Sequence, residues 1–374
     1  MANNNDKKVL NVPALRFPEF TGEWENITIR EACSEFQSGK NIKAEMINDQ
    51  GLYPVYGGNG LRGFTGSYNH DGDYILIGRQ GALCGNVRKV TGKTYVTEHA
   101  IAVCASKEHE TTFLQHLFQK MRLGQYSDQS AQPGLAVNKL LRLNINVPSK
   151  IEQGKIAKIL SLIDERITTQ NKIIEDLKKL KSAIVDKLYS SAKGETYSFR
   201  QLFEVVNEKN KKLIYSNVLS ASQELGMIER SDINIDIKFE QNSISEYKIV
   251  RKGDYVVHLR SFQGGFAFSD RTGICSPAYT ILHPNDLVAY GYLSHFFISK
   301  PFIKSLKLVT YGIRDGRSIN VDEWLDMTVT LPTKREQSHI LAIINAIDNK
   351  LHNENQIHNY MFRQRTYLLK TMFI

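Results

Sequence analysis

The sequence PSKIEQGKI at residues 148–156 returns as PTKREQSHI at residues 332–340, and the same register holds without a gap from 148–189 to 332–373. Each copy places a proline before a stretch in which apolar residues recur every three or four positions, as on one face of a helix. Proline is tolerated there because the first turn of a helix needs no backbone donor. The repeat therefore predicts two long helices that follow two equivalent regions of the chain.

The first predicted helix carries a narrow apolar stripe that is typical of a coiled-coil seam. Its seam positions are Ile163, Ile167, Gln170, Ile174, Leu177, Leu180, Ile184 and Leu188. A helix of roughly 40 residues is about 60 Å long, and an isolated helix of this kind is marginally stable in water. We therefore expect the two helices to pack on each other in an antiparallel coiled coil. The alternative is that each helix packs only on its own domain.

The regions before the two helices are rich in turns, aromatic residues and short β-like runs. In the first region Asp73 begins a short apolar strand that ends at an Arg-Gln-Gly loop, and in the second Asp254 begins a similar strand followed by an arginine and two glycines. The sequence therefore predicts an α+β protein with a pseudo-twofold internal repeat. Its expected parts are a β-rich domain at 1–147, a helix at 148–193, a second β-rich domain at 194–331 and a second helix at 332–374.

The composition is that of a folded protein with a basic surface. The 374 residues carry a formal net charge of +9, which favours a polyanionic partner, although a solvated lysine-rich helix face raises the net charge equally well. The four cysteines are widely spaced, which predicts a reduced interior and a cytoplasmic location. No apolar run has the length of a membrane span or of the core of a signal peptide, so we expect no membrane association.

The glycine-rich loops after the two matching strands are the main candidates for DNA contact. Glycine lets backbone N–H groups approach a phosphate, arginine can form a fork to guanine, and glutamine can pair with adenine. A plain turn with a solvated arginine is the alternative at each loop. The candidate DNA-binding residues are Lys40, Lys43, Tyr56, Asn59, Arg62, Arg79, Gln80, Gln132, Lys209, Lys211, Arg260, Ser261, Gln263, Arg314 and Arg317.

Two glycine patterns that are typical of nucleotide-binding enzymes are incomplete here. Gly58-x-Gly60-x-x-Gly63 matches a dinucleotide fingerprint, but the residues after it predict turn and strand where a helix is required. The stretch 92–94, Gly-Lys-Thr, resembles the end of a phosphate-binding loop, but Val87 stands where the first glycine should be. The sequence therefore predicts no nucleotide cofactor on this chain.

Other catalytic arrangements are also missing from the sequence. The chain has no Pro-Pro pair of the kind that an amino-methyltransferase uses to hold a flipped base. His99 beside Glu98 could be catalytic, but a hydrogen-bonded structural histidine is the more frequent arrangement. No compact set of carboxylates predicts the metal site of a nuclease. We therefore expect neither catalytic nor metal-binding residues.

Two diverged β-rich regions, each followed by Pro-x-x-x-Glu-Gln-x-x-Ile and a coiled-coil helix, resemble the specificity subunit of type I restriction-modification enzymes. The resemblance extends over nearly the whole chain and includes the stretches 56–60, 78–81 and 97–100. It implies that each β-rich domain is a target recognition domain that reads one half of a split, asymmetric DNA sequence, and that the paired helices fix the spacer between the halves. It also implies that the chain is not itself an enzyme.

The resemblance further implies partners and cofactors. The partners are double-stranded DNA, two modification subunits that carry S-adenosylmethionine and methylate adenine, and restriction subunits that use ATP and Mg²⁺ to translocate and cleave. No cofactor is expected on this chain, and the exposed faces of 151–189 and 333–373 are the expected docking surface for the modification subunits. An alternative from another class is an adaptor whose two β-rich domains bind proteins or glycans, which the basic charge and the twin arginine loops disfavour.

Overall fold

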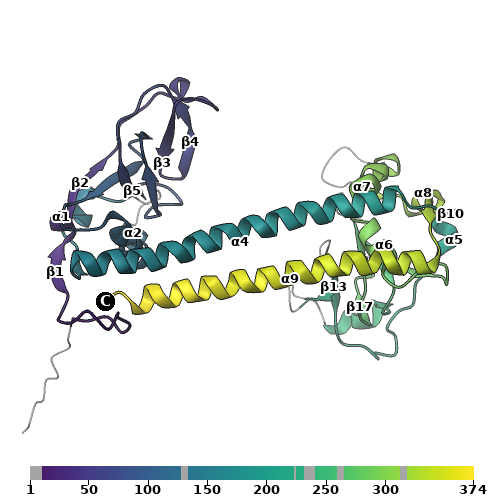
Figure 1. Cartoon of the computed structure of the whole chain (residues 1–374). Helices are drawn as coiled ribbons and strands as arrows, with labels where there is room; N and C mark the ends of the chain where they lie inside the picture. Colours follow the sequence, from purple (N-terminus) through teal and green to yellow (C-terminus); the bar gives the residue numbers. More distant parts are fainter. Residues whose placement is uncertain (1–10, 128–133, 223–224, 231–240, 259–264, 312–317) are drawn as a thin grey trace, which may run out of the picture. The chain divides into compact units, whose positions relative to one another are not determined.

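The computed structural model describes residues 11–127, 134–222, 225–230, 241–258, 265–311 and 318–374. The chain forms two compact units, whose elements are labelled along the sequence-coloured ribbon in Figure 1. Unit 1 combines Met1–Asn171 with Gln356–Ile374, and unit 2 is Lys172–Asn355. None of the described helices is long and apolar enough to cross a lipid bilayer.

Unit 1 is built on a four-stranded antiparallel sheet with the strand order β2-β8-β5-β6. Successive side chains of a strand point to opposite faces of the sheet, and both faces of this sheet are covered. On one face Ile75 and Ile77 pack under a helix, and on the other Leu76 packs beneath a second, three-stranded sheet of order β4-β3-β7. The elements are β2 (Cys33–Ser38), β3 (Tyr53–Gly57), β4 (Gly60–Thr65), β5 (Asp73–Gly78), β6 (Val87–Thr91), β7 (Tyr95–Val96), β8 (Ala100–Ala105) and the covering helix α2 (Thr111–Met121).

Unit 2 repeats the main sheet in the order β11-β18-β15-β16, again antiparallel throughout. Its core is aromatic: the rings of Phe199 and Trp324 stack with centroids 4.4 Å apart, and Phe266 and Phe297 pack beside them. The matching strand order confirms the predicted internal repeat. The elements are β11 (Phe203–Val206), β15 (Tyr255–Val257), β16 (Phe266–Phe268), β18 (Thr280–Pro284), α6 (Tyr292–Phe296) and α7 (Lys300–Ser305).

Short elements flank the two main sheets in equivalent ways. In each unit an early strand pairs antiparallel with the strand that precedes the long helix, β1 with β9 in unit 1 and β10 with β21 in unit 2. The short helices α1 and α5 both begin with a capping box, in which a hydroxyl and the side chain three residues later satisfy free backbone donors. The bounds are β1 (Glu25–Thr28), α1 (Ile29–Ala32), α3 (Val137–Leu140), β9 (Asn144–Val147), β10 (Glu195–Ser198), α5 (Phe199–Leu202), β12 (Leu219–Ser222), β13 (Gly226–Glu229), β14 (Lys248–Val250), β17 (Gly273–Cys275), β19 (Thr310–Tyr311), β20 (Ser318–Ile319), α8 (Val321–Asp326) and β21 (Thr328–Leu331).

The two long helices are α4 (Lys150–Ser190) and α9 (Lys334–Thr371), with 41 and 38 residues. In unit 1 the beginning of α4 packs with the end of α9 in one hydrophobic core, which joins Ile156 and Leu160 to Leu368. In unit 2 the end of α4 packs with the beginning of α9, because the core there contains both Val185 and Ile344. Each helix begins where the other ends, so the predicted antiparallel pairing is confirmed.

Two ion pairs join α4 and α9 at equivalent positions of the repeat. In unit 1 Arg365 of α9 pairs with Asp164 of α4, and its Nη2 lies 3.1 Å from Oδ2. In unit 2 Lys181 of α4 pairs with Asp348 of α9 at 2.5 Å. Asp348 holds in the second copy the position of Asp164 in the first, and Arg365 likewise matches Lys181. The repeat thus places an acid and a base on each helix so that the antiparallel arrangement satisfies both pairs.

A histidine from the globular part of each unit lies beside these ion pairs. His116 of α2 has its Nδ1 4.0 Å from Oδ2 of Asp164, and His295 of α6 interacts electrostatically with Lys181 and Asp348. Burial lowers the pKa of both histidines to about 4, which leaves them neutral at pH 7. Each ion pair between α4 and α9 therefore has a neutral histidine beside it, which comes from a shorter helix of the same unit.

The prediction for the seam was wrong at Leu180, whose side chain is 52% exposed. The next residue, Lys181, faces the partner helix instead, and Val185 is buried one turn later. The seven-residue spacing from Ile167 through Ile174 leads to Lys181 rather than to Leu180. The predicted seam departed from this spacing to follow the apolar residue type.

The glutamine of each Pro-x-x-x-Glu-Gln motif is fully buried and joins the start of the long helix to its unit. In unit 1 Gln153 donates to the carbonyl of Pro148 at 2.9 Å, while its Oε1 accepts from the backbone N–H of Glu110 at 3.0 Å. In unit 2 Gln337 donates to the carbonyls of Pro332 and Leu287 at 2.8 and 2.9 Å.

The Oε1 of Gln337 also accepts from the backbone N–H of Ala289 at 2.7 Å, just as Gln153 does from Glu110. The contacted segments are equivalent in the two units, since each follows the last strand of the main sheet and precedes the next helix. We call this arrangement the glutamine clamp. It fixes the direction in which each long helix leaves its unit.

The glutamate of the motif differs between the copies. Glu152 is buried and forms a bidentate ion pair with Arg16, with both N···O distances at 2.8 Å. Glu336 is exposed and closes a capping box with Thr333, whose hydroxyl donates to Oε2 at 2.7 Å. The clamp is therefore shared by both copies, while the glutamate stabilises the helix start in two different ways.

Removing the clamp in unit 2 by Gln337→Ala should lower the free energy of unfolding by roughly 2 to 4 kcal/mol, because buried backbone groups then lose their partners. The neighbouring Arg335→Ala is the control, since Arg335 is exposed on the same helix turn. Denaturant unfolding of the full chain measures both variants. Equal unfolding free energies for the two variants would contradict a structural role for the clamp.

Candidate nucleic-acid interface

A hollow of about 430 Å³ lies on unit 1 where three loops meet. The first loop is the turn between β3 and β4, the second follows β5, and the third joins β7 to β8. Polar side chains from all three loops line it, together with glycines that leave backbone groups accessible. The lining residues are Gly57, Gly58, Asn59, Arg62, Gln80, Gly81 and His99.

Glycines allow the β3–β4 turn to approach the other loops closely. A Cβ on Gly58 would lie 2.8 Å from the carbonyl oxygen of His99. At Gly60 a Cβ would lie 2.5 Å from Nη1 of Arg88, and its φ of +110° also favours glycine. The Gly-x-Gly-x-x-Gly pattern is therefore explained by a β-hairpin packed on neighbouring loops, in agreement with the prediction that it does not hold a dinucleotide.

Two side chains of the hollow contact each other directly. Nδ1 of His99 lies 3.2 Å from Oε1 of Gln80, and Nε2 of His99 lies 3.2 Å from Oε1 of Glu98. The imidazole ring thus bridges an amide and a carboxylate at the edge of the hollow. It orients the Gln80 amide while leaving it exposed.

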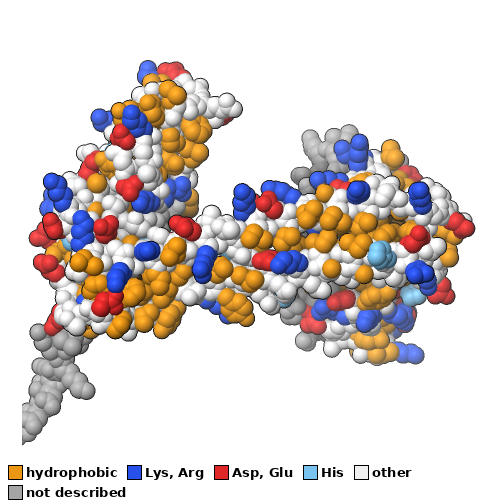
Figure 2. Space-filling model, in the orientation of Figure 1, with side chains coloured by type: hydrophobic (Ala, Val, Ile, Leu, Met, Phe, Trp, Pro, Cys, Tyr) orange, Lys and Arg blue, Asp and Glu red, His pale blue; other side chains and the backbone are white. Residues whose placement is uncertain are grey.

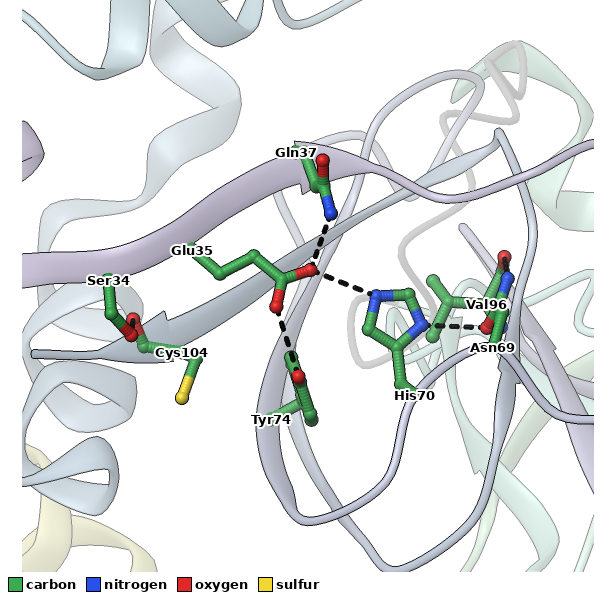
Figure 3. A network of polar contacts seen from close by, with 8 residues as sticks. All are labelled: Ser34, Glu35, Gln37, Asn69, His70, Tyr74, Val96 and Cys104. Atoms are coloured by element: carbon green, nitrogen blue, oxygen red, sulfur yellow. Dashed lines mark hydrogen bonds and ion pairs between the residues drawn. The ribbon is translucent and has the colours of Figure 1, made fainter.

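A polar network holds β7, which leads into the segment that carries Glu98 and His99 (Figure 3). The Asn69 amide donates to the carbonyl of Val96 and accepts from its N–H, both at 2.8 Å, as in a strand pair. The Asn69 Oδ1 lies 2.7 Å from Nδ1 of His70, and Nε2 of His70 lies 3.2 Å from Glu35. The network therefore links β2 and β7 through the buried His70 and the partly buried Glu35 and Asn69.

Tyr74 completes this network on the side of the main sheet. Its hydroxyl donates to Oε2 of Glu35 at 3.0 Å, and Gln37 donates to the other oxygen at 2.7 Å (Figure 3). Burial and the hydrogen bond to Glu35 raise the pKa of Tyr74 to about 12, so the hydroxyl keeps its proton at neutral pH. Every side chain of this network therefore has a hydrogen-bond partner.

Of the candidates predicted in unit 1, the structure brings Asn59, Arg62 and Gln80 together in the hollow. Arg79 is half-buried, and its carbonyl accepts the backbone N–H of Leu135 at 2.9 Å. The ring of Tyr56 packs against the hydrophobic cluster beneath the three-stranded sheet.

The two lysines predicted in unit 1 do not line the hollow. Lys43 is fully solvated beside Glu45, with 3.6 Å between the charged atoms. Lys40 is also exposed, and its backbone N–H donates to the carbonyl of Val96 at 3.0 Å. Both side chains are therefore free to meet a phosphate beside the loop that carries His99.

The candidates in unit 2 are less well defined. Lys209 pairs with Glu246 at 2.5 Å, which neutralises part of its charge, whereas Lys211 is exposed. Six other predicted residues lie outside the described part of the chain, one of them in unit 1: Gln132, Arg260, Ser261, Gln263, Arg314 and Arg317. The described candidate residues therefore form a better defined site in unit 1 than in unit 2.

Two residues of the interface were missed by sequence reasoning. Arg88 lies on β6, and only the folded hairpin brings its guanidinium against Gly60. His99 was interpreted as a structural histidine because it follows Glu98, and it does contact Glu98, but the ring is 47% exposed in the hollow. The combination of a glycine-rich hairpin with an exposed Glu-His pair is the sequence signal that could have indicated His99 as a residue of the site.

The described residues contain no group of three or more His, Cys, Asp or Glu side chains that could hold a metal ion. Burial raises the pKa of the Cys33 and Cys275 thiols to about 12, so these thiols stay protonated at neutral pH. Apart from the imidazole of His99, the polar side chains that line the hollow are two amides and one guanidinium, which can donate hydrogen bonds to a nucleic acid.

A family model described as type I restriction modification DNA specificity domain matches the chain twice, at residues 21–179 and 194–360. The EcoprrI type I restriction enzyme specificity subunit of Escherichia coli is 42% identical over 165 residues, which cover 43% of this chain and 40% of that protein. A putative type I restriction enzyme specificity subunit of Haemophilus influenzae is 22% identical over 87% of both chains. The chain thus aligns with less than half the length of the first relative and with most of the second.

Solved structures share the fold over nearly the full length. A type I restriction-modification system S subunit from M. genitalium superposes with a TM-score of 0.64 at 17% identity, over 97% of this chain and 99% of that chain. A chain from a structural study of complex assembly and conformational transition in a type I system gives a TM-score of 0.57 at 13% identity, over 94% and 97%.

If the hollow faces a nucleic-acid backbone, Arg62→Ala should weaken binding to duplexes of every sequence and lower the slope of log affinity against log salt by about 0.9, the value for one lost phosphate contact. Arg142→Ala is the control, because Arg142 is exposed on unit 1 and does not line the hollow. Titrations at several salt concentrations measure both slopes. An unchanged slope for Arg62→Ala would argue against contact at this site.

Proposed function

This chain belongs to the family of type I restriction-modification DNA specificity subunits, and we propose that it reads a bipartite, asymmetric DNA sequence and directs methylation and cleavage by partner subunits. One observation carries this proposal: two units with the same strand order each begin a long helix through the same glutamine clamp. The chain is a recognition subunit without catalysis of its own.

The diverged surfaces of the two units support a split and asymmetric target. The core sheets and the clamps match between the units, but the sequences after the matching strands differ, with Arg-Gln-Gly at 79–81 and Arg-Ser-Phe-Gln-Gly-Gly at 260–265. Two readers with different side chains in their loops recognise different base sequences. A helix of 41 residues, rising about 1.5 Å per residue, is rigid enough to set the spacer between two half-sites.

Electrostatics supports duplex DNA as the substrate. The net charge of +9 and the exposed Lys40, Lys43 and Arg62 favour phosphate contact, which contributes sequence-independent affinity that falls with salt. The amides of Asn59 and Gln80 can contribute base readout in the major groove. A substrate of this kind places the assembly in the cytoplasm.

The long helices supply a docking surface for partner subunits. Hydrophobic side chains gather along them on the face shown in Figure 2. The large hydrophobic side chains that are exposed on α4 and α9 are Ile151, Leu162, Ile357, Tyr360, Phe362 and Tyr367 in unit 1, and Ile173 and Leu180 in unit 2. We propose that two modification subunits bind here with S-adenosylmethionine and that restriction subunits with ATP and Mg²⁺ join them. Exposed apolar surface of this kind marks an interaction site.

The direct test is to co-express the chain with its cognate modification subunits and to map methylated adenine across the host genome. The expected result is a single split motif with a fixed spacer, because both half-sites must be bound at once. The same host without this chain is the control and should show no such motif. An assembled complex that leaves no split motif, or the same motif in the control, would contradict the proposal.

A further inference from the structure

Two backbone hydrogen bonds and one β-bridge hold the main chain at Gln80. The N–H of Arg79 donates to the carbonyl of His99 at 2.9 Å, and the carbonyl of Arg79 accepts from Leu135 at the same distance. Gln80 itself forms an isolated antiparallel bridge with Gly134. The side chain is exposed, but the point from which it projects is held by the main sheet and by the chain that leads to α3.

The amide of Gln80 is itself held by His99. Nδ1 of His99 lies 3.2 Å from Oε1 of Gln80, and an amide oxygen only accepts, so Nδ1 is the donor in this contact. Nε2 of the same ring lies 3.2 Å from Oε1 of Glu98. An amide offers two N–H donors and two acceptor lone pairs, and His99 occupies one of these four positions. A donor and an acceptor therefore remain free on the exposed side.

This free pair is complementary to adenine. In the major groove adenine presents N7 as an acceptor and the N6 amino group as a donor, and an amide side chain pairs with both. An amide that is held before binding loses less conformational entropy when the contact forms. We infer that Gln80 reads an adenine in the half-site recognised by unit 1, with His99 as a positioning residue that holds the Gln80 amide.

The other side chains of the hollow are less suited to this task. Among the described residues, no hydrogen bond fixes the side chain of Asn59, which lies in the β3–β4 turn, or of Arg62, which lies on β4. Arg62 carries a charge that suits a phosphate, which gives affinity without sequence information. Gln80 is the amide of the hollow whose orientation is set by a neighbour.

The inference rests on the proposed function, and its test begins once the wild-type split motif has been mapped. Gln80→Glu replaces the amide with a carboxylate, which accepts from the N4 amino group of cytosine. One adenine position in one half-site should therefore become a cytosine preference. Gln80→Ala should lower discrimination at that position by roughly 10- to 100-fold, since a bidentate contact is lost. The other half-site should stay unchanged and serves as an internal control for folding.

His99 is tested by a variant pair. His99→Ala should reduce discrimination at the same position, whereas His99→Asn keeps a polar atom near the place of Nδ1 and should retain most of it. Gln125→Glu is the matched control for the charge change, because Gln125 is exposed in unit 1 outside the hollow. Competition binding of the assembled complex to duplexes with each base at each position measures every variant.

The possible results distinguish a failure of the inference about Gln80 from a failure of the proposed function. A wild-type split motif that survives Gln80→Glu and Gln80→Ala with every base preference unchanged would overturn the inference and leave the proposed function standing. The absence of any split motif with the wild-type complex would sink both. Loss of discrimination in His99→Ala with no rescue in His99→Asn would remove His99 from its positioning role.

Discussion

The buried amides of Gln153 and Gln337 are the interaction on which the rest of the architecture depends. Each side chain bonds both the turn before its helix and the loop that leaves the main sheet, so the helix cannot change direction without exposing buried backbone groups. Because the clamp is the same in both copies, α4 and α9 leave their units in equivalent ways. Within each unit an ion pair between α4 and α9 then stabilises their antiparallel pairing.

The glutamine of the motif is therefore a feature of the fold rather than of DNA contact. Its neighbour has diverged: Glu152 pairs with Arg16, whereas Glu336 caps the helix through Thr333. None of the clamped atoms belongs to the loops that line the hollow in unit 1, so a changed side chain in those loops leaves the clamp in place.

Much of the fold could be predicted from the sequence because a repeat with constant register is a strong signal. The helices, their antiparallel pairing and the relation between the β-rich regions all followed from it. Leu180 was assigned wrongly because the seam followed the apolar residue type, while the seven-residue spacing through Ile167 and Ile174 leads to Lys181, which faces the partner helix. Lys181 pairs with Asp348, and this ion pair can be recognised only when the antiparallel register of the two helices is known.

The candidate site was less predictable, since it is assembled from loops. Gln80 and Asn59 were found by residue type, but their meeting with Arg88 and His99 depends on a hairpin that closes over glycine. The central claim is that each unit reads its own half-site, and exchanging one unit for a relative's tests it most directly. Replacing residues 24–147 should change one half of the methylated motif, and replacing 197–331 should change only the other. A motif that neither exchange alters, or that both alter in the same half, would contradict the account.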